Sequence, residues 1–234
     1  MACASGRGLH AMRVVAWMVV WACAGANGAT LCDIGRRQSP IDIRPGTTAR
    51  QALPPLNFDY HAAPLKLADD GHTVRVRFGR GSELRIGKER YGLQQFHFHT
   101  PGGDRIAGEE FPMAAHLLHK SASGQLLAVV VLFRLGTENP LLASLLPLIP
   151  ARADGDHSPM GVTVDARSLL PSGRGYFRYP GSLTAPPCTE GVEWVVLKQP
   201  LELSPAQLAR YRQRFADNAR AVQPLHGRVV LESP

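Results

Sequence analysis

The chain has 234 residues, a formal net charge of +7, 44% hydrophobic residues, 23 glycines and 19 prolines. This length suits one large domain or two small ones and can bury a substantial core. The glycine and proline content argues against a helical bundle. The basic residues are scattered rather than clustered with aromatic residues, which favours a solvated basic surface over a nucleic-acid partner.

The first 26 residues have the pattern of a secretory signal peptide. A basic residue, Arg13, precedes an apolar run from Val14 to Ala24, and small residues follow at the end of that run. The run is short for a membrane span, although a retained membrane anchor is the alternative interpretation. Cleavage would leave residues 27–234 with a charge of 24 − 19 = +5. We therefore expect an exported protein, periplasmic or secreted, with no membrane contact after cleavage.

Several later segments alternate between apolar and polar residues, as strands do. In residues 72–78, HTVRVRF, Val74 and Val76 fall on one face and the arginines on the other. Residues 125–135 and 191–201 are longer apolar runs that predict buried strands. No repeat, linker or shift in composition divides the chain, so these strands predict one mainly β (α+β) domain.

Two helices have clear start signals. Asn139 followed by Pro140 opens the segment LLASLLPLI, and Ser204 followed by Pro205 opens AQLARYRQRFADNAR, which extends to Arg220. Both helices are short and lie outside the strand-rich segments. We therefore expect peripheral helices around a sheet, and no coiled-coil pattern or obvious edge strand that would fix an oligomeric state.

The segment LQQFHFHT, residues 93–100, places two histidines two residues apart. On a strand His97 and His99 would share one face, with Phe96 and Phe98 on the other. A third histidine, His116, would lie beside them if the intervening Gly-rich and Asp-containing loop closes a hairpin. Three neutral imidazoles with one open position are typical of a catalytic zinc site.

Two simpler interpretations compete with metal binding. A histidine on an apolar face is usually a hydrogen-bonded core residue. The segment HLLH, from His116 to His119, also has the spacing of one helix face, but it lacks the glutamate of a HEXXH zinc motif. A pair two residues apart and flanked by phenylalanines is harder to explain as core packing, and spacing alone leaves metal binding and a structural role about equally favoured.

The sequence as a whole resembles the α-class carbonic anhydrases, and the bacterial exported members most. The resemblance rests on seven motifs in the family's order across nearly all of residues 27–234, and HFHTP combined with GSLTAPPC is the most specific pair. The motifs are CDIGRRQSPIDI (32–43), DDGHTVRV (69–76), LQQFHFHTP (93–101), FPMAAHLLHK (111–120), LLAVVVLF (126–133), YPGSLTAPPCTEGVEW (179–194) and QPLHGR (223–228).

This resemblance implies a large, mostly antiparallel twisted sheet with short surface helices. It implies that His97, His99 and His116 bind Zn²⁺ and that zinc-bound hydroxide attacks CO2, giving bicarbonate and a proton. Thr184 would orient the hydroxide and His72 would shuttle the proton. The implied apolar wall for CO2 comprises Leu118, Val129, Leu183, Val192 and Trp194, together with Thr184.

The resemblance also implies partners that support the site. Gln95 would orient the first zinc ligand, and the backbone carbonyl of Asn218 would serve His99. Cys32 and Cys188, the two cysteines left after cleavage, would form the family's disulfide. Export of a chain with two cysteines already favours one disulfide, and two unpaired buried thiols are the alternative.

The chain departs from the family pattern around the site. Gly103 stands where a glutamate normally accepts the threonine proton, with Asp104 and Glu110 as possible substitutes. Ala114 stands where a glutamate normally orients the third zinc ligand. The family's aromatic segment before the first cysteine is shortened, and smaller residues replace larger ones at further positions, namely Ala185, Ala219 and Gly227.

These departures leave two functions in competition. The first is a zinc carbonic anhydrase, a carbonate dehydratase, with a reduced rate. The second is a zinc-binding, carbonic-anhydrase-like protein with little hydratase activity that acts in binding or zinc capture. The complete set of three histidines, Thr184 and His72 favours the enzyme.

Overall fold

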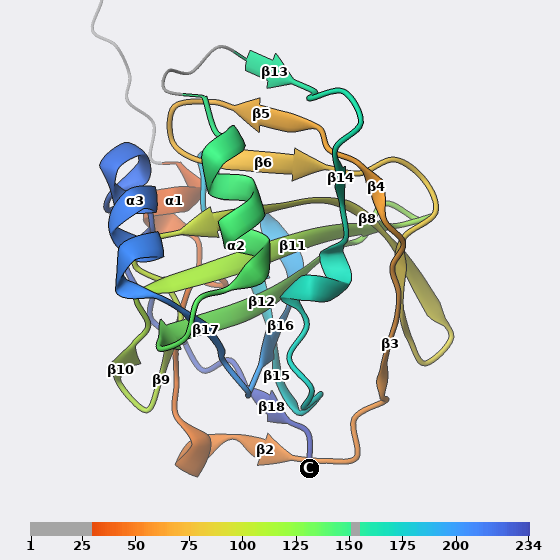
Figure 1. Cartoon of the computed structure of the whole chain (residues 1–234). Helices are drawn as coiled ribbons and strands as arrows, with labels where there is room; N and C mark the ends of the chain where they lie inside the picture. Colours follow the sequence, from red (N-terminus) through yellow and green to blue (C-terminus); the bar gives the residue numbers. More distant parts are fainter. Residues whose placement is uncertain (1–29, 151–154) are drawn as a thin grey trace, which may run out of the picture.

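The computed structural model describes residues 30–150 and 155–234, so the expected signal peptide lies outside the described residues. In the described part, most of the regular structure is strand, and thirteen strands form one twisted sheet (Figure 1). Its central path runs in the order β13-β5-β6-β8-β11-β12-β16-β15-β18-β2, while β7 pairs with β8 and β3, and β17 pairs with β12. This arrangement confirms the predicted mainly β fold.

The strands of this sheet have the following bounds: β2 Ala49–Arg50, β3 Leu56–Asp59, β5 Leu67–Asp69, β6 Val74–Arg77, β7 Glu83–Ile86, β8 Glu89–His99, β11 Met113–Ser121, β12 Leu126–Leu135, β13 Gly155–His157, β15 Tyr176–Ser182, β16 Glu190–Leu197, β17 Leu201–Leu203 and β18 Leu231–Glu232. Most neighbours are antiparallel, whereas β12 runs parallel to β16 and β17, and β18 runs parallel to β2.

Two small sheets and six short helices complete the described residues. The small sheets comprise β1 Asp42–Ile43, β9 Arg105–Ile106 and β10 Glu109–Glu110, and β4 Ala63–Pro64 with β14 Thr163–Val164. The helices are α1 Leu31–Ile34, η1 Pro45–Thr47, α2 Pro140–Leu145, η2 Leu146–Leu148, η3 Ala166–Leu169 and α3 Pro205–Phe215. None of the helices described is long and apolar enough to cross a bilayer.

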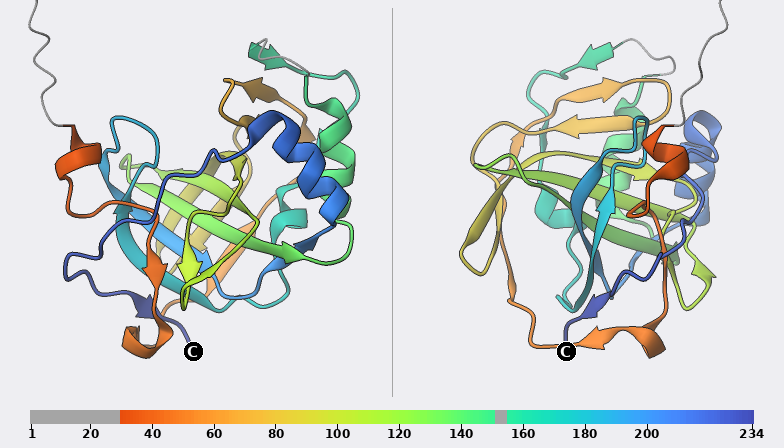
Figure 2. Two further views of the ribbon diagram at one scale, coloured as in Figure 1. Left: turned by 90° about the vertical axis from the view of Figure 1, so that its left-hand side faces the viewer. Right: turned by 180° about the vertical axis from the view of Figure 1, so that it is seen from behind.

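The central sheet separates two apolar clusters because side chains alternate along each strand. On one face Phe96 and Phe98 join the larger cluster, which α2 and α3 cover from outside (Figures 1 and 2). On the other face Trp194 and Tyr179 join a smaller cluster. Helix α1 lies on the side of the sheet away from α2 and α3 (Figure 2). The histidine face of β8 therefore points away from the main core.

Both predicted helices begin where the sequence indicated. The Asn139 side chain accepts hydrogen bonds from two backbone N–H groups at the start of α2, and Ser204 forms a capping box with Gln207 at the start of α3. Helix α3 ends at Phe215 rather than continuing to Arg220, because Asp217 has a positive φ of 51° and the Asn218 N–H donates to Thr100 O instead. This early end turns the chain back toward β8.

Candidate metal centre

The three predicted histidines converge on one point of the sheet. Strands β8 and β11 are antiparallel, and their register places His116 directly opposite His97. Alternation then brings His99 to the same face. One ring nitrogen from each residue lies within 4.8 Å of the others. The loop between the strands therefore does close the hairpin on which the predicted cluster depended.

Two of the three rings have a fixed orientation. His97 Nδ1 lies 2.9 Å from Gln95 Oε1, and His99 Nδ1 donates to the backbone oxygen of Asn218 at 3.1 Å. Both rings consequently aim Nε2 inward, and the two Nε2 atoms are 3.1 Å apart. Since both Nδ1 atoms carry the proton in neutral rings, two lone pairs face each other across this gap. A cation between them would turn that repulsion into attraction.

The third ring is held differently. His116 Nε2 is buried and has no hydrogen-bond partner among the described residues. An atom facing the cavity would be accessible, so Nε2 points into the protein and Nδ1 is left to face the other two rings. Trp194 packs edge-on against the ring, with centroids 5.1 Å apart. Packing rather than hydrogen bonding therefore orients His116.

Burial prepares all three rings for metal binding. It is the largest cause lowering the pKa of His97, His99 and His116 below the ordinary value of 6.5, and neighbouring imidazoles add to the effect at His97 and His116. Neutral imidazole is the form that donates a lone pair to a metal. Three neutral nitrogen donors with open space in front of them fit Zn²⁺, which takes imidazole nitrogens in tetrahedral sites.

The histidines lie at the base of a cavity of about 760 Å³. One wall is apolar and contains Leu118, Leu183, Val192 and Trp194, while the opposite wall is polar and charged. His72 and Thr184 also line the cavity. The structure thus brings together the predicted histidines and nearly all the residues predicted around them.

Val129 is the exception, and its predicted place in the wall is wrong. It pairs with Leu117 in β11 and is fully buried in the larger core, on the far face of β12. Its neighbour Ala128 faces the cavity, opposite Leu118 and Trp194. The alternation of a strand places adjacent residues on opposite faces, so an error of one position moves a residue out of the cavity.

Neither proposed substitute for the missing glutamate reaches Thr184. Asp104 Oδ1 accepts hydrogen bonds from Ile41 N at 3.1 Å and Tyr179 Oη at 2.9 Å, and Glu110 forms a surface ion pair with Arg105. Among the described side chains, none accepts a hydrogen bond from the Thr184 hydroxyl. Its orientation is therefore set by its loop alone.

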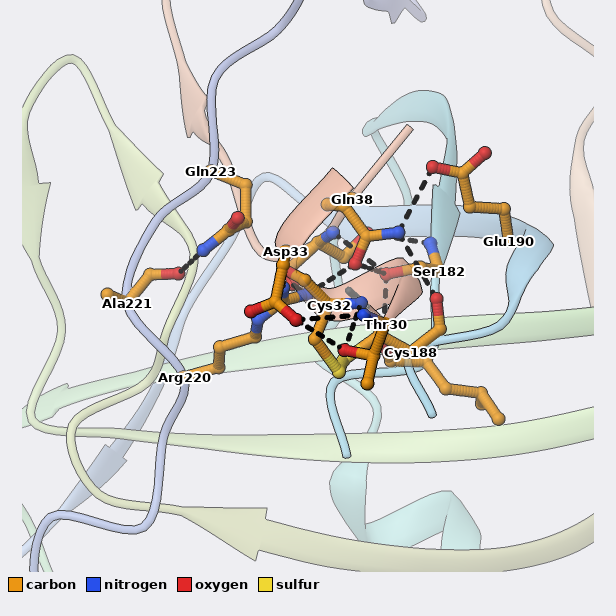
Figure 3. The surroundings of a disulfide bond; sticks show 12 residues. Thr30, Cys32, Asp33, Gln38, Ser182, Cys188, Glu190, Arg220, Ala221 and Gln223 are labelled. Carbon is orange, nitrogen blue, oxygen red and sulfur yellow. Dashed lines mark hydrogen bonds between the residues drawn. A yellow bond between two sulfur atoms is a disulfide. The ribbon is translucent and has the colours of Figure 1, made fainter. Parts of the chain in front are cut away.

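That loop is anchored by the disulfide, as Figure 3 shows. Cys32 and Cys188 are bonded, 156 residues apart in the sequence. Gln38 Nε2 donates to Cys188 O at 3.1 Å, and an Arg220 guanidinium N–H donates to Cys32 O at 2.7 Å. The predicted disulfide is confirmed, and it fixes the segment that follows Thr184.

One residue in the segment after α3, Asn218, connects several parts of the cavity. The Asn218 side chain accepts from Thr100 N at 2.8 Å and donates to His72 O at 2.8 Å, while its backbone oxygen holds His99. The same residue therefore positions a metal ligand and the backbone of the turn that carries His72.

Several residues in and behind the cavity were not predicted from the sequence. Arg75 and Arg77 line its polar wall, because the arginine face of β6 continues the histidine face of β8 and Arg75 pairs with His97. The alternation of HTVRVRF contained this signal once the strand pairing was known. Behind the site, burial raises the pKa of Asp104 to about 7, and no motif indicated its contact with Tyr179.

Comparison with known proteins gives one consistent result. The family model described as eukaryotic-type carbonic anhydrase matches residues 21–234. A carbonic anhydrase of Pectobacterium carotovorum is 37% identical over 86% of this chain and 82% of its own length, and one of Klebsiella pneumoniae is 41% identical with the same coverage. The solved α-carbonic anhydrase of Thermovibrio ammonificans, in complex with the inhibitor sulfanilamide, has a TM-score of 0.82 and 37% identity, covering 86% of this chain and 89% of its own.

The chain therefore belongs to the α-class carbonic anhydrases, a family of enzymes.

Proposed function

We propose that the chain hydrates CO2 reversibly to bicarbonate and a proton, with Zn²⁺ held by His97, His99 and His116. The facing Nε2 atoms of His97 and His99, 3.1 Å apart with both Nδ1 atoms occupied, carry the proposal. In a tetrahedral zinc site with bonds of about 2.0–2.1 Å, two ligand nitrogens lie about 3.3 Å apart. The observed separation is close to this value, which supports the proposal.

The roles of the surrounding residues follow from their chemistry. When bound, zinc lowers the pKa of a water molecule and so supplies a nucleophile at neutral pH. The apolar wall of Leu118, Val192 and Trp194 suits a neutral, linear substrate. The Thr184 hydroxyl orients the nucleophile, and the exposed imidazole of His72 passes the proton to solvent.

The same proposal includes export, in the periplasm or outside the cell. The Cys32–Cys188 disulfide is typical of oxidising compartments, and the predicted signal peptide precedes it. Fractionation of cells that express the full chain tests this part, with the mature N-terminus read by mass spectrometry. A chain that retains residues 1–26 in the cytoplasm would contradict it.

The competing function is zinc binding with little hydration. It is favoured by the unpaired Nε2 of His116 and by the absence of a described acceptor for Thr184. Stopped-flow CO2 hydration by residues 27–234, with zinc quantified in the same sample, separates the two. Near-stoichiometric zinc with hydration that a sulfonamide blocks supports the enzyme. Zinc without a rate above buffer supports the binding protein.

A further inference from the structure

Four buried side-chain atoms have no hydrogen-bond partner in the described part of the chain, and two of them belong to residues that contact the smaller apolar cluster. One is His116 Nε2, on the third metal ligand, and the other is Asp104 Oδ2. Leaving a buried polar group unpaired costs about 1–3 kcal/mol, and such groups are few in folded proteins. Two such atoms beside one apolar cluster indicate a hydrogen-bond partner that they share.

A chain of contacts connects Asp104 to the third predicted ligand. Its Oδ1 is held by Ile41 N and Tyr179 Oη, at 3.1 Å and 2.9 Å. The Tyr179 ring stacks on Trp194 with centroids 5.8 Å apart, and Trp194 in turn packs edge-on against His116. One aromatic pair therefore links the carboxyl group to the ligand.

Ala114 has neighbours on both sides of this pair. It precedes His116 by two residues on β11 and so shares its face, and it belongs to the same buried cluster as Ile41, Tyr179 and Trp194. A Cβ built on Gly102 would come within 3.3 Å of the Ala114 methyl group, so the strand and the segment that carries Asp104 are in close contact here. The alanine side chain lacks the two outer carbons and the two carboxylate oxygens of the glutamate expected at this position.

We propose that Asp104 is a positioning residue for the third metal ligand, and that it acts through one water molecule enclosed beside Ala114. His116 Nε2–H donates to the water oxygen, and the water donates to Asp104 Oδ2. Both unpaired atoms are then satisfied, and the water has the two polar partners that a buried water requires at minimum. The inference rests on the proposed metal centre.

The arrangement would do for His116 what Gln95 does for His97. A proton fixed on Nε2 selects the tautomer whose Nδ1 carries a lone pair, and that nitrogen faces the other ligands. The departure at Ala114 is then compensated within the chain by Asp104, whose carboxyl group approaches the ligand from the neighbouring segment.

The test measures the zinc dissociation constant of the chain by competition with a chelator. Asp104→Leu keeps the size of the side chain and removes its acceptor, and we expect zinc affinity to fall about 10–100-fold. Asp104→Asn retains an acceptor and should lose less. Tyr179→Phe is the matched control, because it removes the hydrogen bond to Oδ1 and leaves Oδ2 intact. Its zinc affinity should stay within about threefold of wild type, a change of about 0.65 kcal/mol.

The inference is overturned if Asp104→Leu binds zinc as tightly as wild type, or if Tyr179→Phe loses as much as Asp104→Leu. The melting temperature of the zinc-free proteins shows whether each variant is folded. Should Asp104→Leu fail to fold, Asp104→Leu with Ala114→Glu returns a carboxylate to His116, and recovered zinc affinity supports the proposal.

A high-resolution crystal structure of the wild-type chain decides the question independently. Density for a water within hydrogen-bond distance of both His116 Nε2 and Asp104 Oδ2 is expected, and a dry gap between them would refute the bridge. A wild-type chain that binds no zinc would overturn the proposed function instead, while the metal-free crystal structure would still report on the water.

Discussion

The two halves of the metal centre differ in how their groups are held. On the β8 side, His97 and His99 each have a hydrogen-bond partner for the nitrogen that points away from the centre, namely Gln95 and the backbone of Asn218. On the β11 side, His116 Nε2 has no direct partner in the described residues, and Thr184 lacks the acceptor that the family provides.

The difference shows which partners a single substitution can remove. The β8 half uses a neighbour on the same strand and a backbone oxygen, and a backbone oxygen is present whatever residue occupies position 218. The other half depends on long side chains at positions 103 and 114, where this chain has glycine and alanine. The three predicted ligands themselves all lie on the paired strands β8 and β11.

The largest effect should come from the disulfide that anchors the loop of Thr184. In the chain-entropy model, a crosslink between residues 156 apart contributes about 4–5 kcal/mol. We expect Cys32→Ser with Cys188→Ser to lower the melting temperature by about 10–15 °C in calorimetry. At temperatures where the variant is folded, its CO2 hydration should fall more than its zinc affinity. An unchanged melting temperature would contradict the first expectation, and equal losses would contradict the second.

Replacing the ligands one at a time compares the two halves directly. In structural sites with four protein ligands zinc binds with about 10–16 kcal/mol, which is about 3 kcal/mol for each ligand and indicates at least a hundredfold loss of affinity when one is removed. His97→Ala should weaken zinc binding more than His116→Ala does, because the His97 ring is held in place by a direct hydrogen bond. Zinc titration of both variants measures this, and the reverse order would show that the β11 half is the better organised one.

Strand β11 also carries His119, which is not one of the three predicted metal ligands. It is fully buried, its Nε2 lies 2.6 Å from Tyr60 Oη, and burial lowers its pKa to about 4. The unfolded chain takes up this proton near pH 6.5 and the folded chain does not. Stability should therefore fall as the pH drops from about 6.5 to about 4, by about 1.4 kcal/mol per pH unit.

His119→Gln can still accept the hydrogen bond from Tyr60 and cannot titrate. Denaturant unfolding at a series of pH values should give a shallower slope for this variant than for wild type across that window. Parallel curves would show that His119 carries its proton in the folded chain.

Restoring the family residues behind His116 should strengthen the weaker half. Ala114→Glu combined with Asp104→Asn supplies a direct carboxylate partner without placing a second carboxylate next to it. We expect zinc affinity, measured by chelator competition, to rise by less than about tenfold, because a direct carboxylate replaces a partner that Asp104 already supplies through water. Ala114→Glu alone should gain less, since two buried carboxyl groups repel each other when both are charged. No gain in the double variant would mean that His116 is already as well oriented as a glutamate could make it.

Restoring the other missing glutamate should fail. Gly103 has a φ of +85°, and a Cβ there would lie 3.3 Å from Pro40 Cγ. Gly103→Glu should therefore cost about 1–2 kcal/mol of stability in thermal unfolding, without raising the hydration rate. A faster variant of unchanged stability would show that the segment from 101 to 104 rearranges to accept the side chain.

The sequence predicted most of this site because its three histidines lie on strands. The alternation around Phe96 and Phe98 was sufficient to place His97 and His99 on one face, and the family motifs placed His116, Thr184 and His72 in the same cavity. Both helix starts followed from local signals, and the disulfide followed from the two cysteines left after cleavage and from the resemblance to the family. Each of these depends on a short stretch of sequence or on a spacing that the family shares.

What the sequence could not provide depends on register and on long-range contacts. Val129 was assigned to the cavity and Ala128 occupies that face, since one position along β12 decides between wall and core. The contact of Asp104 with Tyr179 joins segments 75 residues apart, and no local sequence pattern indicates it. The positive φ of Gly103, likewise, is visible only in the folded chain.

The position of Asn218 has a consequence for the order of folding. It joins His99 and the turn of His72 across 119 and 146 residues of sequence. Closing such long loops is slow compared with pairing β8 and β11, which are near neighbours in the chain. The three histidines can therefore meet early, on a hairpin that does not yet have its support from residue 218. Zinc captured at that stage would bind a partly organised site and dissociate readily. A slow rate of zinc release would therefore indicate that the last third of the chain has docked.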